Sequence, residues 1–380
     1  MAFFLIICYI IYMRNLVCFT GGGTTGHVSP GCAVIESLRE KYEYSYLWIG
    51  SRAENEKHIL ERFAVPYISI PAGKLRRYFS LKNITDLFKI GFGFIKAFFI
   101  LVRFRPLAVF SKGGYVSFPV LLAAKILKIP SVSHESDLIP GLATRLNSRL
   151  SDKIILGFSA AAAYFPESMQ NKLLVLGNPV RKEIFDGNRK KLFSTFGLKS
   201  KKPVLLVMGG SQGAKQLNDL LSANIETLLE KCIIIHQCGK TFEQKIHHPD
   251  YICRPFFNEE FADALAGADI VVSRAGASSL FEIAALRKPS IIIPLSLGSS
   301  RGDQIKNAAF FSDQQAAVVL ENPDEEIFLA RVEELLKNPR LCKKLSEGLS
   351  TIAAGNAAEK IAGLLHSVIS EKSKAKARRK

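Results

Sequence analysis

Two glycine-rich stretches of the sequence could bind a phosphate group. The first, GGGTTGHVSP at residues 21–30, follows the apolar run 16–20, and the second, GGSQGA at 209–214, follows the apolar run 204–208. Each precedes a segment with helical periodicity, so its backbone N–H groups lie at the start of a helix, where phosphate or another polar oxygen group is favoured. A tight strand-to-helix turn would use the same glycines. Either stretch alone fits both interpretations, and two in tandem favour ligand binding.

His27 is the ionisable side chain of the first stretch. At the start of a helix its protonated form is disfavoured by about 0.3–1 kcal/mol, which leaves a neutral imidazole able to accept a proton. The alternative is a histidine that caps the helix or packs at the turn. A nicotinamide coenzyme is disfavoured because the next apolar run, 46–50, ends without the Asp or Glu that binds a ribose. Neither stretch contains the Gly-Lys-Ser/Thr of a P-loop.

A third candidate, SRAGASSLFE at residues 273–282, also follows an apolar run. Its small residues could turn their amides toward a diphosphate, and Glu282, about one helical turn later, could accept hydrogen bonds from a ribose diol. A capping or surface glutamate is the alternative. Gln304 follows a glycine- and serine-containing loop and could contact a sugar hydroxyl or only water. The sequence contains no Asp-x-Asp metal clamp, so amides, helix ends and Arg181 would have to neutralise a diphosphate.

The elements that position these residues alternate in type along the chain. Apolar runs of strand length alternate with amphipathic segments up to about residue 176, and the same rhythm restarts at 204 after the polar, lysine-rich stretch 187–202. This is the βαβ pattern of a parallel sheet covered on both faces. We predict an α/β fold with two similar units in tandem, whose ligands bind at the carboxyl ends of the strands.

The expected organisation has six parts. They are an apolar N-terminal extension at 1–13, a first domain at 14–186, a linker at 187–202, a second domain at 203–355, a helix at 356–370 that packs back on the first domain, and a basic tail at 371–380. The extension is shorter than the ~20 residues that span a bilayer. It is either sequence upstream of a natural start at Met13 or a membrane-associating tail.

The seven cysteines contain no C-x-x-C pair, which indicates a reducing compartment and disfavours a zinc site or a thiol enzyme.

Six motifs, in this order and spacing, resemble the MurG family of N-acetylglucosaminyltransferases, which belongs to glycosyltransferase family 28. They are GGTTGHVSPG from residue 22, SKGGYVSFP from 111, HE at 134–135, GNPVR from 177, GGSQGA from 209 and SRAGASSLFE from 273. The resemblance covers the chain from Arg14 to about Ser370. It implies the GT-B architecture, in which two Rossmann-like parallel-sheet domains face each other across a cleft. It also implies inverting transfer of GlcNAc from UDP-GlcNAc to the muramyl 4-hydroxyl of undecaprenyl-pyrophosphoryl-MurNAc-pentapeptide (lipid I), giving lipid II for peptidoglycan, without a cofactor or metal.

The resemblance also implies roles for particular residues. It assigns UDP-GlcNAc binding to Ser211, Asn258, Ala277, Ser278, Ser279, Leu280, Phe281, Glu282 and Gln304 of the second domain, with Arg181 near the nucleotide. From the first domain, Thr24, Thr25, Gly26 and Asp137 would contact the sugar or a diphosphate, while Tyr115, His134 and Glu135 would line the acceptor side. His27 becomes the candidate general base.

Four residues depart from the family's pattern. Thr25 and Phe118 each replace a glycine, and HESD at 134–137 stands where the family has His-Glu-Gln-Asn. Asp137 therefore loses a hydrogen-bond donor and adds a negative charge near a diphosphate. Two alternatives stay open: a related GT-B enzyme that glycosylates another lipid, and a UDP-GlcNAc-binding protein with weak turnover.

The formal charge of +17 requires an anionic partner. Many basic residues lie in segment 73–105, where Asp86 is the only acidic residue. They are Lys74, Arg76, Arg77, Lys82, Lys89, Lys96, Arg103 and Arg105, and they are interleaved with Phe79, Phe88, Phe92, Phe94, Phe98 and Phe99. A lipid-linked acceptor requires contact with a membrane, and each basic residue near an anionic leaflet contributes about 1 kcal/mol. We expect peripheral attachment to the cytoplasmic face of the bacterial inner membrane. Nucleic acid is disfavoured because no recognised binding motif accompanies the charge.

Overall fold

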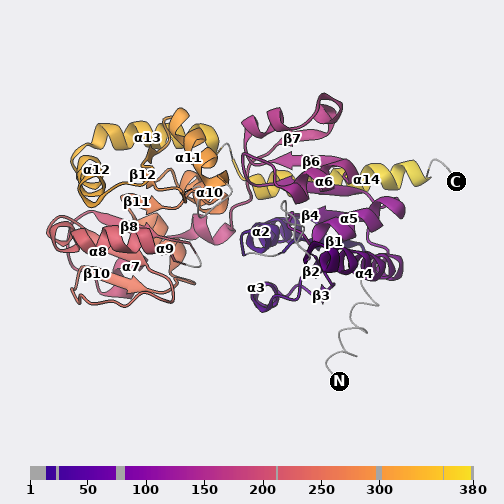
Figure 1. Cartoon of the computed structure of the whole chain (residues 1–380), viewed down its shortest axis with the longest axis horizontal. Coiled ribbons are helices and arrows are strands. Elements are labelled where there is room, and N and C mark those ends of the chain that lie inside the picture. The colour runs from indigo at the N-terminus through magenta and orange to yellow at the C-terminus, as the bar shows by residue number, and fades with distance from the viewer. Residues whose placement is uncertain are drawn as a thin grey trace, which may run out of the picture. The chain divides into compact units, whose positions relative to one another are not determined.

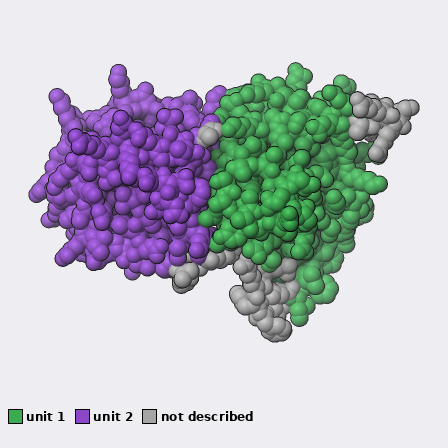
Figure 2. Space-filling model, turned by 90° about the horizontal axis from the view of Figure 1, so that it is seen from above, with its two compact units in different colours: residues 1–179, 356–380 green, residues 180–355 purple. Residues whose placement is uncertain are grey.

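The computed structural model describes residues 14–22, 25–73, 82–210, 213–296, 302–353 and 355–377. The expected extension at 1–13, the end of the basic tail, and the predicted site residues Thr24 and Ser211 lie outside the described residues, as does the side chain of Thr25. The chain forms two compact units (Figure 2): unit 1 comprises Met1–Pro179 with Asn356–Lys380, and unit 2 comprises Val180–Gly355.

Unit 1 contains a seven-stranded parallel sheet with the strand order β3-β2-β1-β4-β5-β6-β7. Its strands are β1 (Leu16–Thr20), β2 (Ser45–Gly50), β3 (Tyr67–Ser69), β4 (Ala108–Ser111), β5 (Ser131–Glu135), β6 (Lys153–Leu156) and β7 (Leu173–Val175). Its helices are α2 (Thr25–Lys41), α3 (Glu54–Arg62), α4 (Lys82–Phe104), α5 (Ser117–Ile126), α6 (Leu142–Leu150), α14 (Ala357–Ala377) and the 3-10 helices η1 (Ser159–Tyr164) and η2 (Glu167–Lys172).

Strand β1 is buried along its whole length because both faces of the sheet are covered. Val17 and Phe19 belong to a core with α2 and α14, whereas Leu16 and Cys18 belong to a core with α4 and α5. Successive side chains of a strand point to opposite faces, which explains this division. Since β1 pairs with β2 on one side and β4 on the other, the sheet has its topological switch point between β1 and β4.

Unit 2 repeats this design with a six-stranded parallel sheet of order β10-β9-β8-β11-β12-β13. Its strands are β8 (Val204–Met208), β9 (Ile233–Gln237), β10 (Tyr251–Arg254), β11 (Ile270–Ser273), β12 (Ser290–Ile292) and β13 (Val318–Val319). Its helices are η3 (Lys182–Asp186), α7 (Arg189–Phe196), α8 (Lys215–Leu229), α9 (Phe261–Gly267), α10 (Ala277–Ala285), α11 (Asp303–Asp313), α12 (Glu325–Lys337) and α13 (Pro339–Ile352). The switch point lies between β8 and β11.

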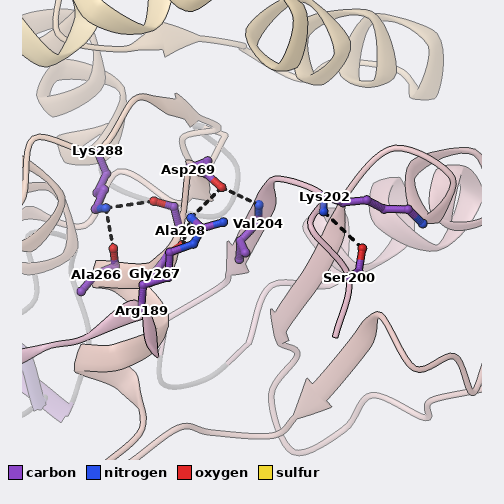
Figure 3. Close-up of polar contacts among 9 residues, drawn as sticks. All are labelled: Arg189, Ser200, Lys202, Val204, Ala266, Gly267, Ala268, Asp269 and Lys288. Atoms are coloured by element: carbon purple, nitrogen blue, oxygen red, sulfur yellow. Dashed lines mark hydrogen bonds and ion pairs between the residues drawn. The ribbon is translucent and has the colours of Figure 1, made fainter. Parts of the chain in front are cut away.

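The stretch expected to be a linker, 187–202, contains α7 and belongs to unit 2. Figure 3 shows how α7 is held: Arg189 Nη1 donates to the Gly267 carbonyl at 2.7 Å and to Asp269 Oδ2 at 2.8 Å. The same Asp269 oxygen accepts the backbone N–H of Val204 at 2.8 Å, which connects α7 to the first strand of the sheet. The sequence did not reveal this docking because Arg189 and Asp269 are distant in the chain.

The last helix, α14, packs against α2 of unit 1; Figure 1 draws α14 in yellow and α2 in indigo. His366 stacks on Tyr42 with 4.0 Å between ring centroids, and its Nδ1 lies 2.8 Å from the Tyr44 hydroxyl. Lys41 and Glu359 form an ion pair between the two helices. Among the helices that the structure describes, none is long and apolar enough to cross a membrane.

Candidate functional site

The loops that follow β1 and β4 meet at the switch point of unit 1. A Cβ atom on Gly114, whose φ is +82°, would lie 2.2 Å from the Gly22 carbonyl oxygen, so this approach of two backbones requires glycine. His27 lies in the first turn of α2, and a Cβ on Gly113 would be 3.7 Å from its Cδ2 and 4.0 Å from its Nε2. The structure therefore places the His27 ring beside Gly113 in the loop after β4, at the edge of the sheet where ligands of such folds bind.

Two buried side chains that the sequence did not single out support the first glycine loop. Trp48 Nε1 donates to the Gly21 carbonyl at 3.0 Å. Glu56 lies behind Gly22, where an added Cβ would be 2.5 Å from its Oε1, and it accepts hydrogen bonds from the Ser51 amide at 2.9 Å and hydroxyl at 2.6 Å. Trp48 is the only tryptophan of the chain, and this is the one sequence signal that marks it.

His134 lies at the end of β5 and is only 1% exposed. Its Nε2 is 3.0 Å from the Gly177 carbonyl, and because a carbonyl only accepts hydrogen bonds, this nitrogen carries the proton. Burial, helped by the Lys112 ammonium, lowers the pKa of His134 well below its ordinary value. The ring is therefore neutral, and it holds the loop that contains Gly177.

Glu135 orders the loop that follows β5. Its Oε1 accepts the Asp137 amide at 3.0 Å and its Oε2 accepts the Gly141 amide at 3.3 Å. Burial raises the pKa of the carboxyl to about 7 and Asp137 adds to the rise, while the Thr144 hydroxyl, the Asp137 amide and the Lys112 ammonium oppose it. Asp137 is half-buried at the start of this loop, and Tyr115 packs partly on the core between the sheet and α4 and α5.

Lys112 is an unexpected member of this site. It follows β4 directly, is 1% exposed and donates a hydrogen bond to Ser136 Oγ. Burial lowers the pKa of its ammonium to about 8, and the carboxylates of Glu135 and Asp137 act in the opposite direction. A lysine next to two glycines is usually a solvated loop residue, so its type and position gave no signal of burial.

In unit 2 the loop after β8 and the start of α10 follow two neighbouring strands, β8 and β11, which flank the switch point. Gly210 and Gly213 have φ values of +80° and +75°, which favour glycine. The residue before α10 is Gly276, which has no side chain to cap the helix, while Ser278 and Ser279 are partly exposed. The Leu280 amide already donates to the Gly276 carbonyl at 3.0 Å, so within the predicted stretch Ala277 to Phe281 the amides before Leu280 are the ones that could contact a phosphate.

Arg181 and Glu282, which the sequence predicted on the nucleotide side, are in contact. The guanidinium donates to Glu282 Oε1 through Nε at 3.1 Å and through Nη2 at 3.0 Å. The Arg181 Cζ atom lies 5.3 Å from the centre of the Phe261 ring. The backbone N–H of Phe261 donates to the carbonyl of the exposed Asn258 at 3.4 Å. Burial raises the pKa of Glu282, and Arg181 counteracts this effect. Arg181, Asn258 and Glu282 are therefore grouped around Phe261.

Three amide or guanidinium side chains hold the remaining loops of unit 2. Gln304 accepts the Leu295 amide at 3.2 Å through Oε1, so its amide donor is the half that could bind a sugar hydroxyl. Gln237 donates to the Gly210 carbonyl and accepts the Phe257 amide, both at 3.2 Å, and so connects the glycine loop to the segment before Asn258. Arg274 donates to Gln216 at 2.8 Å and to the Ile293 and Pro294 carbonyls, which fixes it as a structural residue.

The described residues contain no group of three or more His, Cys, Asp or Glu side chains arranged to hold a metal ion.

The predicted site residues that the structure describes divide between the two units. Gly26, His27, Tyr115, His134, Glu135 and Asp137 lie in unit 1; Arg181, Asn258, Ala277, Ser278, Ser279, Leu280, Phe281, Glu282 and Gln304 lie in unit 2. Each set lies at the ends of strands or on the loops and helices that follow them.

Two protein-family models match this chain. The model of the glycosyltransferase family 28 N-terminal domain matches residues 17–156, and that of the glycosyltransferase family 28 C-terminal domain matches residues 204–362. The two matches fall on the sheets of unit 1 and unit 2, and the second extends into α14.

Full-length relatives give the same result. The chain is 43% identical to the UDP-N-acetylglucosamine–N-acetylmuramyl-(pentapeptide) pyrophosphoryl-undecaprenol N-acetylglucosamine transferase of Treponema denticola, over 94% of this chain and 98% of that protein. It is 40% identical to the protein of the same name from Legionella pneumophila strain Paris, over 93% of this chain and 97% of the relative. The crystal structure of Acinetobacter baumannii MurG is similar with a TM-score of 0.72 and 26% identity, over 93% of this chain and 100% of that one.

Proposed function

The chain belongs to glycosyltransferase family 28, and from this membership we propose that it transfers N-acetylglucosamine from UDP-GlcNAc to the muramyl 4-hydroxyl of lipid I. The product is lipid II, the lipid-linked precursor of peptidoglycan. The observation that carries the proposal is the near-full-length similarity to the N-acetylglucosamine transferases of Treponema denticola and Legionella pneumophila. The family and the GT-B fold class predicted from the sequence are confirmed.

For the donor, we assign the nucleotide sugar to unit 2. The diphosphate would accept hydrogen bonds from the first amides of α10 and from the glycine loop that contains Ser211, where the positive end of a helix favours negative charge. Glu282, oriented by Arg181, would accept the ribose hydroxyls, and the backbone of Asn258 would bind the uracil. Support comes from the grouping of these residues around Phe261 and from the uncapped start of α10.

For the acceptor, we assign the sugar hydroxyl to His27. The muramyl 4-hydroxyl oxygen forms a bond to the anomeric carbon, and the bond from that carbon to the β-phosphate oxygen breaks with its electron pair leaving on UDP. His27 accepts the hydroxyl proton, a role worth about 10²–10⁴ in rate. Attack opposite to the leaving UDP inverts the anomeric centre. The position of His27 beside Gly113, at the switch point of the sheet, supports this assignment.

The decisive experiment incubates the purified chain with radiolabelled UDP-GlcNAc and a lipid I analogue. We expect labelled lipid II, and competition with other lipid acceptors such as diacylglycerol should not reduce it. Product on a different lipid would identify a related transferase. UDP-GlcNAc binding without product would identify a binding protein, and neither binding nor product would refute the proposal.

His27→Ala tests the general base. We expect kcat to fall at least about 100-fold while the affinity for UDP-GlcNAc changes little, because the proton is transferred only during the reaction. His58→Ala, in α3 of the same unit, is the matched control. Equal losses of kcat and donor affinity in His27→Ala would make this histidine a structural residue.

We further propose that α4 is the membrane-attachment surface of unit 1. Seven apolar side chains of this helix are each at least 39% exposed, and apart from the adjacent Leu87 and Phe88 they recur at intervals of three or four residues: Ile84, Leu87, Phe88, Phe92, Ile95, Phe99 and Val102. Such spacing puts them on one side of a helix. The cations Lys89, Lys96 and Arg103 lie on the same helix. Lys89 forms an ion pair at 3.1 Å with Asp86, which is also in α4.

An apolar stripe with flanking cations fits a peripheral surface that inserts between lipids and attracts an anionic leaflet. Because the acceptor is lipid-linked and its sugar donor is cytoplasmic, the surface would face the cytoplasmic leaflet. Flotation with phosphatidylglycerol vesicles should show that Phe88→Ser with Phe92→Ser weakens binding at least about tenfold. Ile327→Ser, on α12 of unit 2, is the control for losing an exposed apolar side chain. Undiminished flotation of the double variant would refute the surface.

A further inference from the structure

We propose that Lys112 is a positioning residue that compensates the negative charge of Asp137, so that this chain binds a diphosphate substrate although an acidic residue lies in its acceptor loop. The inference rests on the proposed function of the site. It concerns the two residues at which the loop departs from the family's His-Glu-Gln-Asn, namely Ser136 and Asp137.

The geometry connects Lys112 to both departures. Its ammonium donates to the hydroxyl of Ser136, the neighbour of Asp137, from a position that is 1% exposed. An ammonium that is removed from water requires counter-charges, and the carboxylates of Glu135 and Asp137 supply them. Lys112 thus lies beneath the loop that both acids occupy.

Glu135 alone is a poor counter-charge for Lys112. Its two oxygens accept the amides of Asp137 and Gly141, and burial raises its pKa, which favours the uncharged carboxyl. Asp137, which is half-buried, lies nearer to solvent than either partner. The positive charge of Lys112 beneath the loop therefore opposes the negative charge that Asp137 adds to it.

The charge of Lys112 also affects His134 and lies beside the loop that follows β4. The Lys112 ammonium contributes to the lowered pKa of His134, so the cation, the two acids and this imidazole share one electrostatic environment. Lys112 immediately precedes Gly113, the residue that faces the His27 ring. A change in the charge of this cluster therefore acts next to the proposed base and next to the acceptor loop, and the effect should appear in the KM for lipid I.

A double-mutant cycle tests the inference, with KM for a lipid I analogue and kcat measured for the wild type, Lys112→Met, Asp137→Asn and the double variant. We expect Lys112→Met to raise this KM at least about tenfold. Asp137→Asn should lower KM only about threefold when Lys112 is present but more than about tenfold when it is absent. Lys125→Met, which removes an exposed lysine of α5, controls for the loss of one positive charge from unit 1.

Equal effects of Asp137→Asn in the two backgrounds would overturn the inference, because independent residues give additive free energies. If Lys112→Met does not fold, as judged by circular dichroism, Lys112→Gln replaces it, since glutamine keeps a hydrogen-bond donor for Ser136 while removing the charge. Lipid II formation by the wild type with no coupling would reject this inference alone. No product from the wild type would reject both the proposed function and the inference.

Discussion

A buried histidine of unit 2 should make the free energy of unfolding depend on pH. His236, in β9, is fully buried, and its Nδ1 and Nε2 lie 2.9 Å from the Tyr251 hydroxyl and 3.1 Å from Asn218 Oδ1. Asn218 Nδ2 donates to the Cys238 carbonyl at 2.9 Å, so Oδ1 is the accepting end of that amide. Nε2 therefore carries the proton and Nδ1 accepts from Tyr251. Protonation of Nδ1 would break this chain of bonds.

The magnitude follows from the pKa. Burial lowers the pKa of His236 from 6.5 to about 4. Between these values the unfolded chain binds a proton that the folded chain does not, so stability falls as the pH falls from 6.5 toward 4 and is constant above 6.5. Each pH unit in this range is worth about 1.4 kcal/mol, which gives a loss of about 2 kcal/mol at pH 5 from this residue.

The assay is urea unfolding of the wild type and His236→Gln at pH 7 and pH 5. Glutamine does not titrate, so the loss between the two pH values should be about 2 kcal/mol smaller in the variant, whatever its stability at pH 7. Circular dichroism follows both units, whereas fluorescence of Trp48, the only tryptophan, follows unit 1. His134 contributes to acid sensitivity in unit 1 and is the same in both proteins. Identical pH dependence in the two proteins would refute the reasoning.

Two further changes test the sites of the two units. Glu282→Gln removes the charge that pairs with Arg181, and we expect UDP-GlcNAc affinity measured by calorimetry to fall roughly 30-fold, about 2 kcal/mol; unchanged affinity would exclude a role for the carboxylate. Gly114→Ala forces a Cβ to within 2.2 Å of the Gly22 carbonyl at a φ of +82°, and should lower the free energy of unfolding by at least about 2 kcal/mol in Trp48 fluorescence. Gly363→Ala, in α14 with nothing within 4 Å, should instead raise it by about 0.5–1 kcal/mol; a similar loss in both variants would contradict the steric argument.

Local patterns allowed much of the fold to be predicted. The alternation of apolar runs with amphipathic segments predicted the two parallel sheets that the structure contains. The glycine stretches after the first strand of each unit lie at the two switch points. The linker was harder to predict, because the polar composition of 187–202 hides a helix that is held by contacts to Asp269 and Gly267. Composition reports local preference, whereas such docking depends on distant partners.

The fold class and the glycine loops at the start of each unit could be predicted from the sequence, because periodicity and turn chemistry act over a few neighbouring residues. The family followed from the resemblance of six motifs in order and spacing. The sequence also placed His27 at a helix start. Only the tertiary structure decided which charged residues are buried. Lys112 and Glu56 look like ordinary surface residues in the sequence, yet they lie against Ser136 and Gly22, because segments distant in the chain converge at the switch point. Burial and charge pairing are properties of that convergence, and they have no signature in the neighbouring residues.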